Sequence, residues 1–227
     1  MGDDALAENL ARIRAGIARA AAHSSREASE VTIVAAGKTV PIASIRRARE
    51  LGVSDFGENY VKELRDKARQ LPEPRWHFIG TLQTNTAHHV AELADVVQTL
   101  ASERATDRLA RRAVGAGRLI EALIEVDFTG ERPGTSPERV AAFADRVATL
   151  DGLRLVGLMT LPPIPARSDD SRRFFVRLRE LRDRLAEVHP EVVELSMGMS
   201  LDYEAAVEEG ATIVRIGTAL FGERPPV

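Results

Sequence analysis

Eight short aliphatic runs alternate with longer amphipathic segments along this chain of 227 residues, and that alternation constrains the fold more than any other feature. Most of the runs are continuous stretches of apolar residues, which is typical of parallel strands buried on both faces. The segments between them have the apolar spacing of helices that cover a sheet. The predicted strands are 31–38, 55–58, 76–80, 96–100, 122–128, 155–160, 193–198 and 212–217.

Helical patterns fill the intervals between these runs, and proline and glycine mark several of their ends. Pro41 suits the start of a helix, while Gly52 and Gly210 suit the stops. Eight such units predict an α/β fold, a single (β/α)₈ TIM-barrel domain over residues 1–227 with an extra N-terminal helix. A doubly wound open sheet is the competing architecture, but it would need fewer strands. The predicted helices are 1–23, 41–51, 60–71, 84–93, 103–115, 137–150, 169–188 and 202–209.

Composition excludes several functional classes. The net charge is −3 with both signs interspersed, and no basic stripe with interleaved aromatics indicates a nucleic-acid partner. The chain has no cysteine, so disulfides, thiolate nucleophiles and cysteine-based zinc sites are absent. The first 23 residues lack the apolar core of a signal peptide, and no run approaches the roughly 20 apolar residues that cross a bilayer. We therefore expect a cytoplasmic protein with no membrane partner.

Lys38 is the most distinctive candidate for chemistry, because only three of the 31 basic residues are lysines. Lys62 and Lys67 fall in a charged helical pattern and are expected to be ordinary. Lys38 instead ends the apolar run 31–38. A primary amine forms a Schiff base with an aldehyde, which a guanidinium cannot do. The alternative is a strand-end lysine whose ammonium group reaches solvent.

Two segments near the end of the chain have the composition of an anion site. In a barrel the carboxyl ends of the strands form the functional face, and phosphate sites recur in the last two loops. The segment after the seventh strand offers the Ser200 hydroxyl, and the one after the eighth offers Thr218 and the Gly217 amide. Each segment alone is explained by a helix cap or a turn. Together with a strand-end lysine they favour a phosphate-bearing aldehyde as ligand.

Six motifs in order make the sequence resemble the pyridoxal phosphate homeostasis protein family, small relatives of the alanine racemase N-terminal barrel. The resemblance extends from about residue 6 to Gly222. The motifs are Lys38-Thr39, Phe56-Gly57-Glu58-Asn59, the stretch 76–85, Gly157-Leu158-Met159-Thr160, Leu195-Ser196-Met197-Gly198-Met199-Ser200 and Val214-Arg215-Ile216-Gly217-Thr218. Any one of them alone is weak, whereas the ordered set is specific.

The resemblance implies that pyridoxal 5'-phosphate (PLP) is held on Lys38 as an internal aldimine. It implies that Ser200, Gly217 and Thr218 bind the phosphate. It further implies that Arg215 faces the pyridine nitrogen, that Asn59 lines the pocket near the ring, and that Met199 forms one wall.

The resemblance also implies little turnover. A guanidinium cannot accept a proton, so Arg215 disfavours the protonated ring that makes PLP a strong electron sink. The second base of alanine racemase, a tyrosine, comes from a C-terminal domain, whereas this sequence ends at residue 227. We therefore expect a monomeric carrier that buffers PLP and passes it to apo PLP-dependent enzymes, with no established catalytic residue. The alternatives are a PLP-dependent amino-acid racemase of low activity, a cofactor-free Schiff-base aldolase and a non-catalytic interaction barrel.

Three residues depart from the family pattern. Gly37 replaces a usual serine and is expected to loosen the turn that holds Lys38. Thr86 replaces a lysine, and Asp127 replaces a common asparagine.

Other polar residues have structural interpretations. His77 is expected to be a packed core histidine with a possible secondary role in the pocket. Glu58 is expected either to pair with an arginine or to act as a general base. His88 and His89 are expected to form a solvated pair, and no metal site is predicted.

Overall fold

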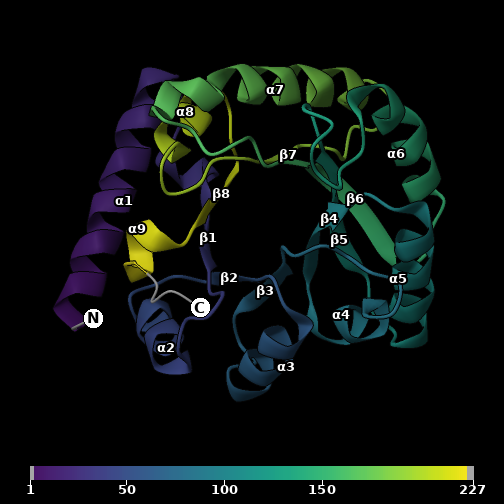
Figure 1. Ribbon diagram of the computed structural model, residues 1–227, viewed down its shortest axis with the longest axis horizontal. Coiled ribbons are helices and arrows are strands. Elements are labelled where there is room, and N and C mark those ends of the chain that lie inside the picture. Colours follow the sequence, from purple (N-terminus) through teal and green to yellow (C-terminus); the bar gives the residue numbers. More distant parts are fainter. Residues whose placement is uncertain (1–2, 224–227) are drawn as a thin grey trace.

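Eight parallel strands form a closed barrel in the computed structural model, which describes residues 3–223 (Figure 1). Neighbouring strands follow chain order, and β8 pairs with β1 to close the sheet. The predicted (β/α)₈ barrel is therefore confirmed, and the open sheet was the wrong alternative. The strands are β1 (Thr32–Ala36), β2 (Asp55–Glu58), β3 (Arg75–Phe78), β4 (Val96–Leu100), β5 (Ile120–Val126), β6 (Leu153–Thr160), β7 (Glu194–Ser196) and β8 (Ile213–Ile216).

Helices surround the strands as an outer ring (Figure 1). Every predicted helical segment is present within residues 3–223, but two of them begin as 3₁₀ turns, at Pro137–Arg139 and Ser168–Ser171. The first two residues of the predicted helix 1–23 lie outside the described residues. A short helix after β8 was not predicted. The α-helices are α1 (Asp3–His23), α2 (Ile42–Glu50), α3 (Val61–Gln70), α4 (Ala87–Leu93), α5 (Glu103–Gly115), α6 (Val140–Ala148), α7 (Arg172–Ala186), α8 (Tyr203–Glu208) and α9 (Thr218–Phe221), and a further 3₁₀ turn spans Ala28–Glu30.

The extra helix α1 lies against α8 and α9 and buries its apolar stripe there (Figure 1). Leu6, Leu10 and Ile13 on this stripe are almost fully buried. The Asn9 side chain donates to the Leu220 carbonyl at 3.1 Å, which ties α1 to α9. Arg14 donates to the carbonyls after α2 at 3.2 Å. Helix α1 thus connects α9, which follows the last strand, with the end of α2.

The apolar core has two layers. The larger lies between the sheet and the helices and contains, for example, the tilted ring pair Phe56–Trp76 with centroids 5.8 Å apart. The smaller lies apart from it and is formed by residues of strands alone: Val34, Val96, Leu123, Val156, Met159 and Ile213. This inner layer is small, and buried polar side chains fill the rest of the barrel interior.

The first strand is shorter than predicted. β1 ends at Ala36, and Lys38 lies in the turn that follows. The Gly37 amide still bonds to the Gly57 carbonyl at 2.9 Å, but Thr39 then adopts a left-handed φ of 62°, which stops the ladder. Lys38 therefore belongs to a rim turn, a correction to its expected place at the strand end.

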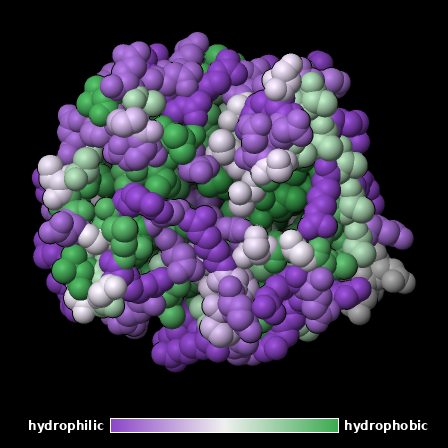
Figure 2. Space-filling view, turned by 180° about the vertical axis from the view of Figure 1, so that it is seen from behind, coloured by the Kyte–Doolittle hydropathy of each residue, from purple (hydrophilic) through white to green (hydrophobic). Residues whose placement is uncertain are grey.

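The face of the molecule drawn in Figure 2 is mostly hydrophilic. Figure 2 shows apolar side chains in recesses between polar ridges on the side opposite to that of Figure 1. Within residues 3–223, no helix is both long and apolar enough to cross a membrane.

Candidate functional site

The seven residues predicted to bind a cofactor lie on four neighbouring strands of the barrel or in the segments that follow them. In the closed order, β7, β8, β1 and β2 are adjacent. Because all strands are parallel, the segments after them meet at one end of the barrel. Lys38 follows β1, Asn59 follows β2, Arg215 lies in β8 with Gly217 and Thr218 after it, and Met199 and Ser200 follow β7.

Lys38 is half-buried, and its Nζ atom lies 5.3 Å from the centre of the Tyr60 ring. Tyr60 immediately precedes α3 and is 52% exposed, so the amine sits at the rim. Such a contact holds an ammonium group by cation–π attraction, worth about 0.5–1 kcal/mol at an exposed site. No pattern in the sequence predicts this contact.

Lys67 is a buried lysine, contrary to the expectation that it is ordinary. Its side chain is 9% exposed, and Nζ donates to the Glu58 carboxylate at 2.7 Å and to the Glu63 carboxylate at 2.8 Å. The third bond goes to the Gly37 carbonyl at 2.7 Å. An ammonium group has three donors, so all of them are used. Glu58 is thus in an ion pair, as expected, but with a lysine in place of an arginine.

The same cluster holds the turn of Lys38 from both sides. Lys67 binds the carbonyl of the preceding residue, Gly37, while Glu63 accepts from the backbone amide of the following residue, Thr39, at 2.8 Å. A Cβ atom on Gly37 would lie 2.4 Å from Glu58 Oε1, so a side chain there would have to displace this carboxylate from its place in the ion pair. Glycine at this position therefore leaves space for the ion pair. The turn that contains Lys38 is held instead by Lys67 and Glu63.

The segments after β7 and β8 touch each other. Ser200 Oγ accepts a hydrogen bond from the Ala219 amide at 3.1 Å, and Met199 N donates to the buried Asp202 carboxylate at 2.7 Å. Gly217 and Thr218 open helix α9, and amides at the start of a helix have no acceptor within it. Hydroxyl and amide donors of both segments are thereby brought together, as an anion site requires.

Arg215 is buried at 4% exposure on β8. Its Nη1 donates to Ser196 Oγ at 2.5 Å, and its Nη2 donates to the Thr160 carbonyl at 2.9 Å. Burial lowers the pKa of Arg215 to about 10, so it still carries its charge near neutral pH. A fixed cation next to the anion-binding segments favours a negatively charged ligand.

Glu125 is a site residue that the sequence analysis missed. It is 6% exposed on β5, and burial raises its pKa to about 7, although the charges of Arg215 and Arg132 lower it. Its only signal in the sequence is a carboxylate within the apolar run 122–126. Glu125 therefore takes up a proton at a much higher pH than an exposed glutamate does.

A Glu125→Gln variant is expected to flatten the pH dependence of stability between pH 5 and 8. The folded-state pKa of Glu125 lies above its ordinary value of 4.5, so the proton stabilises the fold below pH 4.5 and this contribution is lost as pH rises through about 7. A shift of this size corresponds to about 3 kcal/mol. Urea unfolding of both proteins at several pH values measures the difference. An equally steep loss of stability in the variant would contradict this assignment, and Glu131→Gln in the next loop is the exposed control.

The structure also shows the surroundings of the other polar residues singled out from the sequence. His77 is fully buried, as expected of a core histidine, and it bonds to Asp55. His88 and His89 are half-buried with ring centroids 3.8 Å apart. Asp127 accepts bonds from the Thr129 and Arg132 amides and so shapes its own loop. Among residues 3–223 no group of metal-binding side chains is present.

Comparison with known proteins gives consistent results. Residues 4–225 match the family described as "Alanine racemase, N-terminal domain". A "Pyridoxal phosphate homeostasis protein" of Aquifex aeolicus is 39% identical over 222 residues, covering 96% of this chain and 97% of that protein. The protein of the same name from Pseudomonas aeruginosa is 40% identical, with 96% of each chain covered.

Solved structures show the same fold. PipY of Synechococcus elongatus with PLP bound superposes with a TM-score of 0.85 at 33% identity, covering 96% of this chain and 100% of PipY. An alanine racemase of Clostridium difficile reaches a TM-score of 0.75 at 16% identity, where this chain spans 57% of its length. The second likeness concerns the fold alone.

Proposed function

This chain belongs to the alanine racemase N-terminal domain family, among its pyridoxal phosphate homeostasis proteins, and we propose that it binds PLP and acts in PLP homeostasis. The cofactor identity is supported by PipY, which shares the fold and was solved with PLP bound. The role is that of a carrier or buffer, which keeps a reactive aldehyde bound and supplies it to apo-enzymes that need it. We place the carrier in the cytoplasm as a monomer with one cofactor-binding barrel domain.

The donor groups fit PLP. The ligand has an aldehyde, an anionic phosphate and a ring nitrogen, and the barrel rim offers an amine, a set of hydroxyl and amide donors, and a buried guanidinium. Lys38 would hold the aldehyde carbon, while Ser200, Gly217 and Thr218 would hold the phosphate. Arg215 would donate to the ring nitrogen, and Asn59 and Met199 would line the pocket.

Lys38 would hold the cofactor reversibly, because a primary amine condenses with an aldehyde and releases water, whereas the guanidinium groups of this chain cannot. When bound, PLP supplies an electrophilic carbon and an electron-withdrawing ring. Because Arg215 cannot take up a proton from the ring nitrogen, this chain binds the ring in its less electron-withdrawing form, which suits storage better than turnover.

The observation that carries the proposal is the convergence of Lys38, Arg215 and the Ser200–Ala219 contact on three adjacent strands, β7, β8 and β1. Borohydride trapping tests it. The purified protein is mixed with PLP, reduced, digested and mapped by mass spectrometry. The expected result is one modified peptide that contains Lys38, because hydride converts the C=N bond into a stable secondary amine. Modification spread over Lys62 and the N-terminus, or no uptake at all, would contradict the proposal.

A further inference from the structure

A chain of buried hydrogen bonds extends from Arg215 across the barrel interior to Asp55. Arg215 Nη1 lies 2.5 Å from Ser196 Oγ, which lies 2.7 Å from Gln98 Oε1. Gln98 Nε2 lies 2.9 Å from His77 Nδ1, and His77 Nε2 lies 2.9 Å from Asp55 Oδ1. The three middle side chains are fully buried. β4 and β7 are not neighbours in the sheet, so the bond between Gln98 and Ser196 crosses the interior.

The chemistry of the two ends, with a neutral His77 between them, fixes the direction of every bond. Arg215 can only donate, so Ser196 Oγ accepts from it and donates its own O–H to the Gln98 carbonyl oxygen. The Gln98 amide then donates to His77 Nδ1, which leaves the imidazole proton on Nε2. This proton goes to the Asp55 carboxylate, which can only accept. All four bonds therefore point from the guanidinium toward Asp55.

The charges along the chain agree with this direction. Burial lowers the pKa of His77 and keeps the ring neutral near pH 7, so one ring nitrogen remains an acceptor. Burial of Asp55 raises its pKa, but the hydrogen bonds from His77 and Ser54 outweigh that effect and hold it below its usual value. Asp55 is thus a carboxylate, and a neutral imidazole joins it to the amide of Gln98.

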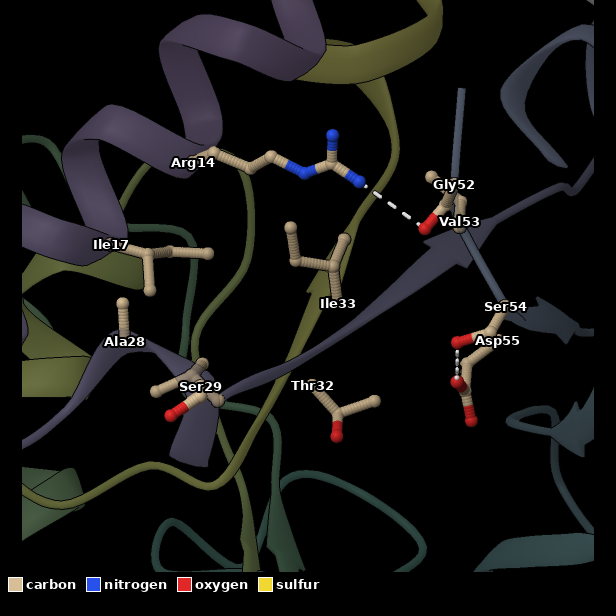
Figure 3. A pocket seen from close by; sticks show the side chains of 11 residues that line it. Arg14, Ile17, Ala28, Ser29, Thr32, Ile33, Gly52, Val53, Ser54 and Asp55 are labelled. Atoms are coloured by element: carbon tan, nitrogen blue, oxygen red, sulfur yellow. Dashed lines mark hydrogen bonds between the residues drawn. The ribbon is translucent and has the colours of Figure 1, made fainter. Parts of the chain in front are cut away.

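The two ends of this hydrogen-bond chain, Arg215 in β8 and Asp55 in β2, lie on either side of β1, the strand that leads to Lys38. Val34 of β1 is in register with Asp55 on one side and with Arg215 on the other. At its far end the chain reaches a pocket of about 450 Å³ at the amino-terminal ends of β1 and β2, where Ser54 donates to Asp55 (Figure 3). None of the proposed cofactor residues lines this pocket.

We propose that Gln98 and His77 are positioning residues for Arg215, whose guanidinium they hold in a single donor arrangement at the cofactor site. The identity of the cofactor rests on the proposed function, whereas the direction of the hydrogen bonds from Arg215 to Asp55 does not. The Gln98 carbonyl holds the hydroxyl hydrogen of Ser196 away from Arg215, and His77 holds Gln98 in that orientation by accepting from its amide. A substitution at Gln98 or His77, in the middle of this hydrogen-bond chain, therefore changes how the Arg215 guanidinium is held without altering Arg215 or its direct partner.

The first experiment needs no cofactor. Nitrogen NMR of the histidine side chains in the full chain at pH 7 is expected to show His77 neutral with its proton on Nε2. In Gln98→Glu the new carboxylate accepts from Ser196 and also requires a proton on His77 Nδ1, so His77 should become doubly protonated. A wild-type His77 with its proton on Nδ1, or one charged on both nitrogens, would overturn the proposed direction.

The second experiment uses PLP. Gln98→Met keeps the length of the side chain but removes both hydrogen bonds. We expect its dissociation constant for PLP to rise about tenfold, which corresponds to about 1.4 kcal/mol, and the absorption maximum of the bound cofactor to move. Trapping on Lys38 should persist. Thr212→Val is the matched control, because the Thr212 hydroxyl donates to Glu194 and takes no part in the hydrogen-bond chain. It should change neither the dissociation constant for PLP nor the absorption maximum.

The outcomes separate the two claims. If the wild-type protein takes up no PLP, the proposed function fails and the NMR arm still decides the orientation of the chain. If Gln98→Met binds PLP with the wild-type affinity and spectrum, the positioning role of Gln98 is refuted even though PLP is the ligand. Equal effects in Gln98→Met and Thr212→Val would likewise refute it, since only general stability would then be involved.

Discussion

A Lys38→Ala variant is expected to lose covalent retention of PLP completely. The near-visible absorption band of the mixture should match that of free PLP, and borohydride reduction should leave no mass increase at this position. The phosphate donors near Ser200 and Thr218 remain, so weak non-covalent binding persists. We expect the dissociation constant to rise at least about 100-fold, or about 2.7 kcal/mol. Absorbance titration and mass spectrometry measure both effects.

Two matched variants sharpen this test. Lys38→Arg keeps the positive charge next to Tyr60 but cannot form a Schiff base, so it should also lose the band. Lys62→Ala removes an exposed lysine of α3 and should bind like the wild-type protein. A reducible adduct that survives in Lys38→Ala and disappears in Lys62→Ala would show that the wrong amine was assigned.

The second large effect is expected for Lys67→Met, which should lower the free energy of unfolding by about 3–5 kcal/mol. This is the usual cost when one partner of a buried ion pair is removed and the other charge stays. Here the Glu58 carboxylate loses its ammonium partner, and the Gly37 carbonyl loses a donor. Chemical denaturation measures the loss, and Lys62→Met on the same helix is the exposed control with a change near zero.

A double-mutant cycle identifies the source of that loss. In Lys67→Met combined with Glu58→Gln, the carboxylate is neutralised as well, so the total should be smaller than the sum by about 1–3 kcal/mol. Strict additivity would contradict a coupled pair. Because Lys67 also fastens the turn before Lys38, the single variant should release PLP faster than the control, whereas a stability loss with unchanged release would confine Lys67 to folding.

The fold was predictable because its signal is repeated eight times. Most strands appear as apolar runs, and β2, β4 and α5 begin and end at the predicted residues. The limits of β1 were wrong, since Gly37 and Lys38 continue the apolar run while the backbone already turns at Thr39. Hydrophobic pattern reports burial, and it does not report a left-handed φ.

The site was predictable only in part. Motifs placed Lys38, Ser200 and Arg215 near the carboxyl ends of strands, where the barrel gathers them. Lys67 was missed, although its spacing of four from Glu63 is a visible helical ion-pair signal, because its burial depends on the packing of α3 over β2. Gln98 stands alone as an amide in an apolar strand. Its partner Ser196 is 98 positions away, a distance that no local pattern spans.

The tight space at Gly37 has a consequence for how relatives of this protein can diverge. A Cβ atom there would lie 2.4 Å from Glu58 Oε1, so a side chain at position 37 requires the carboxylate to move within its ion pair with Lys67. Relatives that combine serine at this position with the acid at position 58 should therefore hold that carboxylate in a different place. Grafting serine at position 37 should displace the Glu58 carboxylate here, and its cost should vanish in a background that lacks the acid.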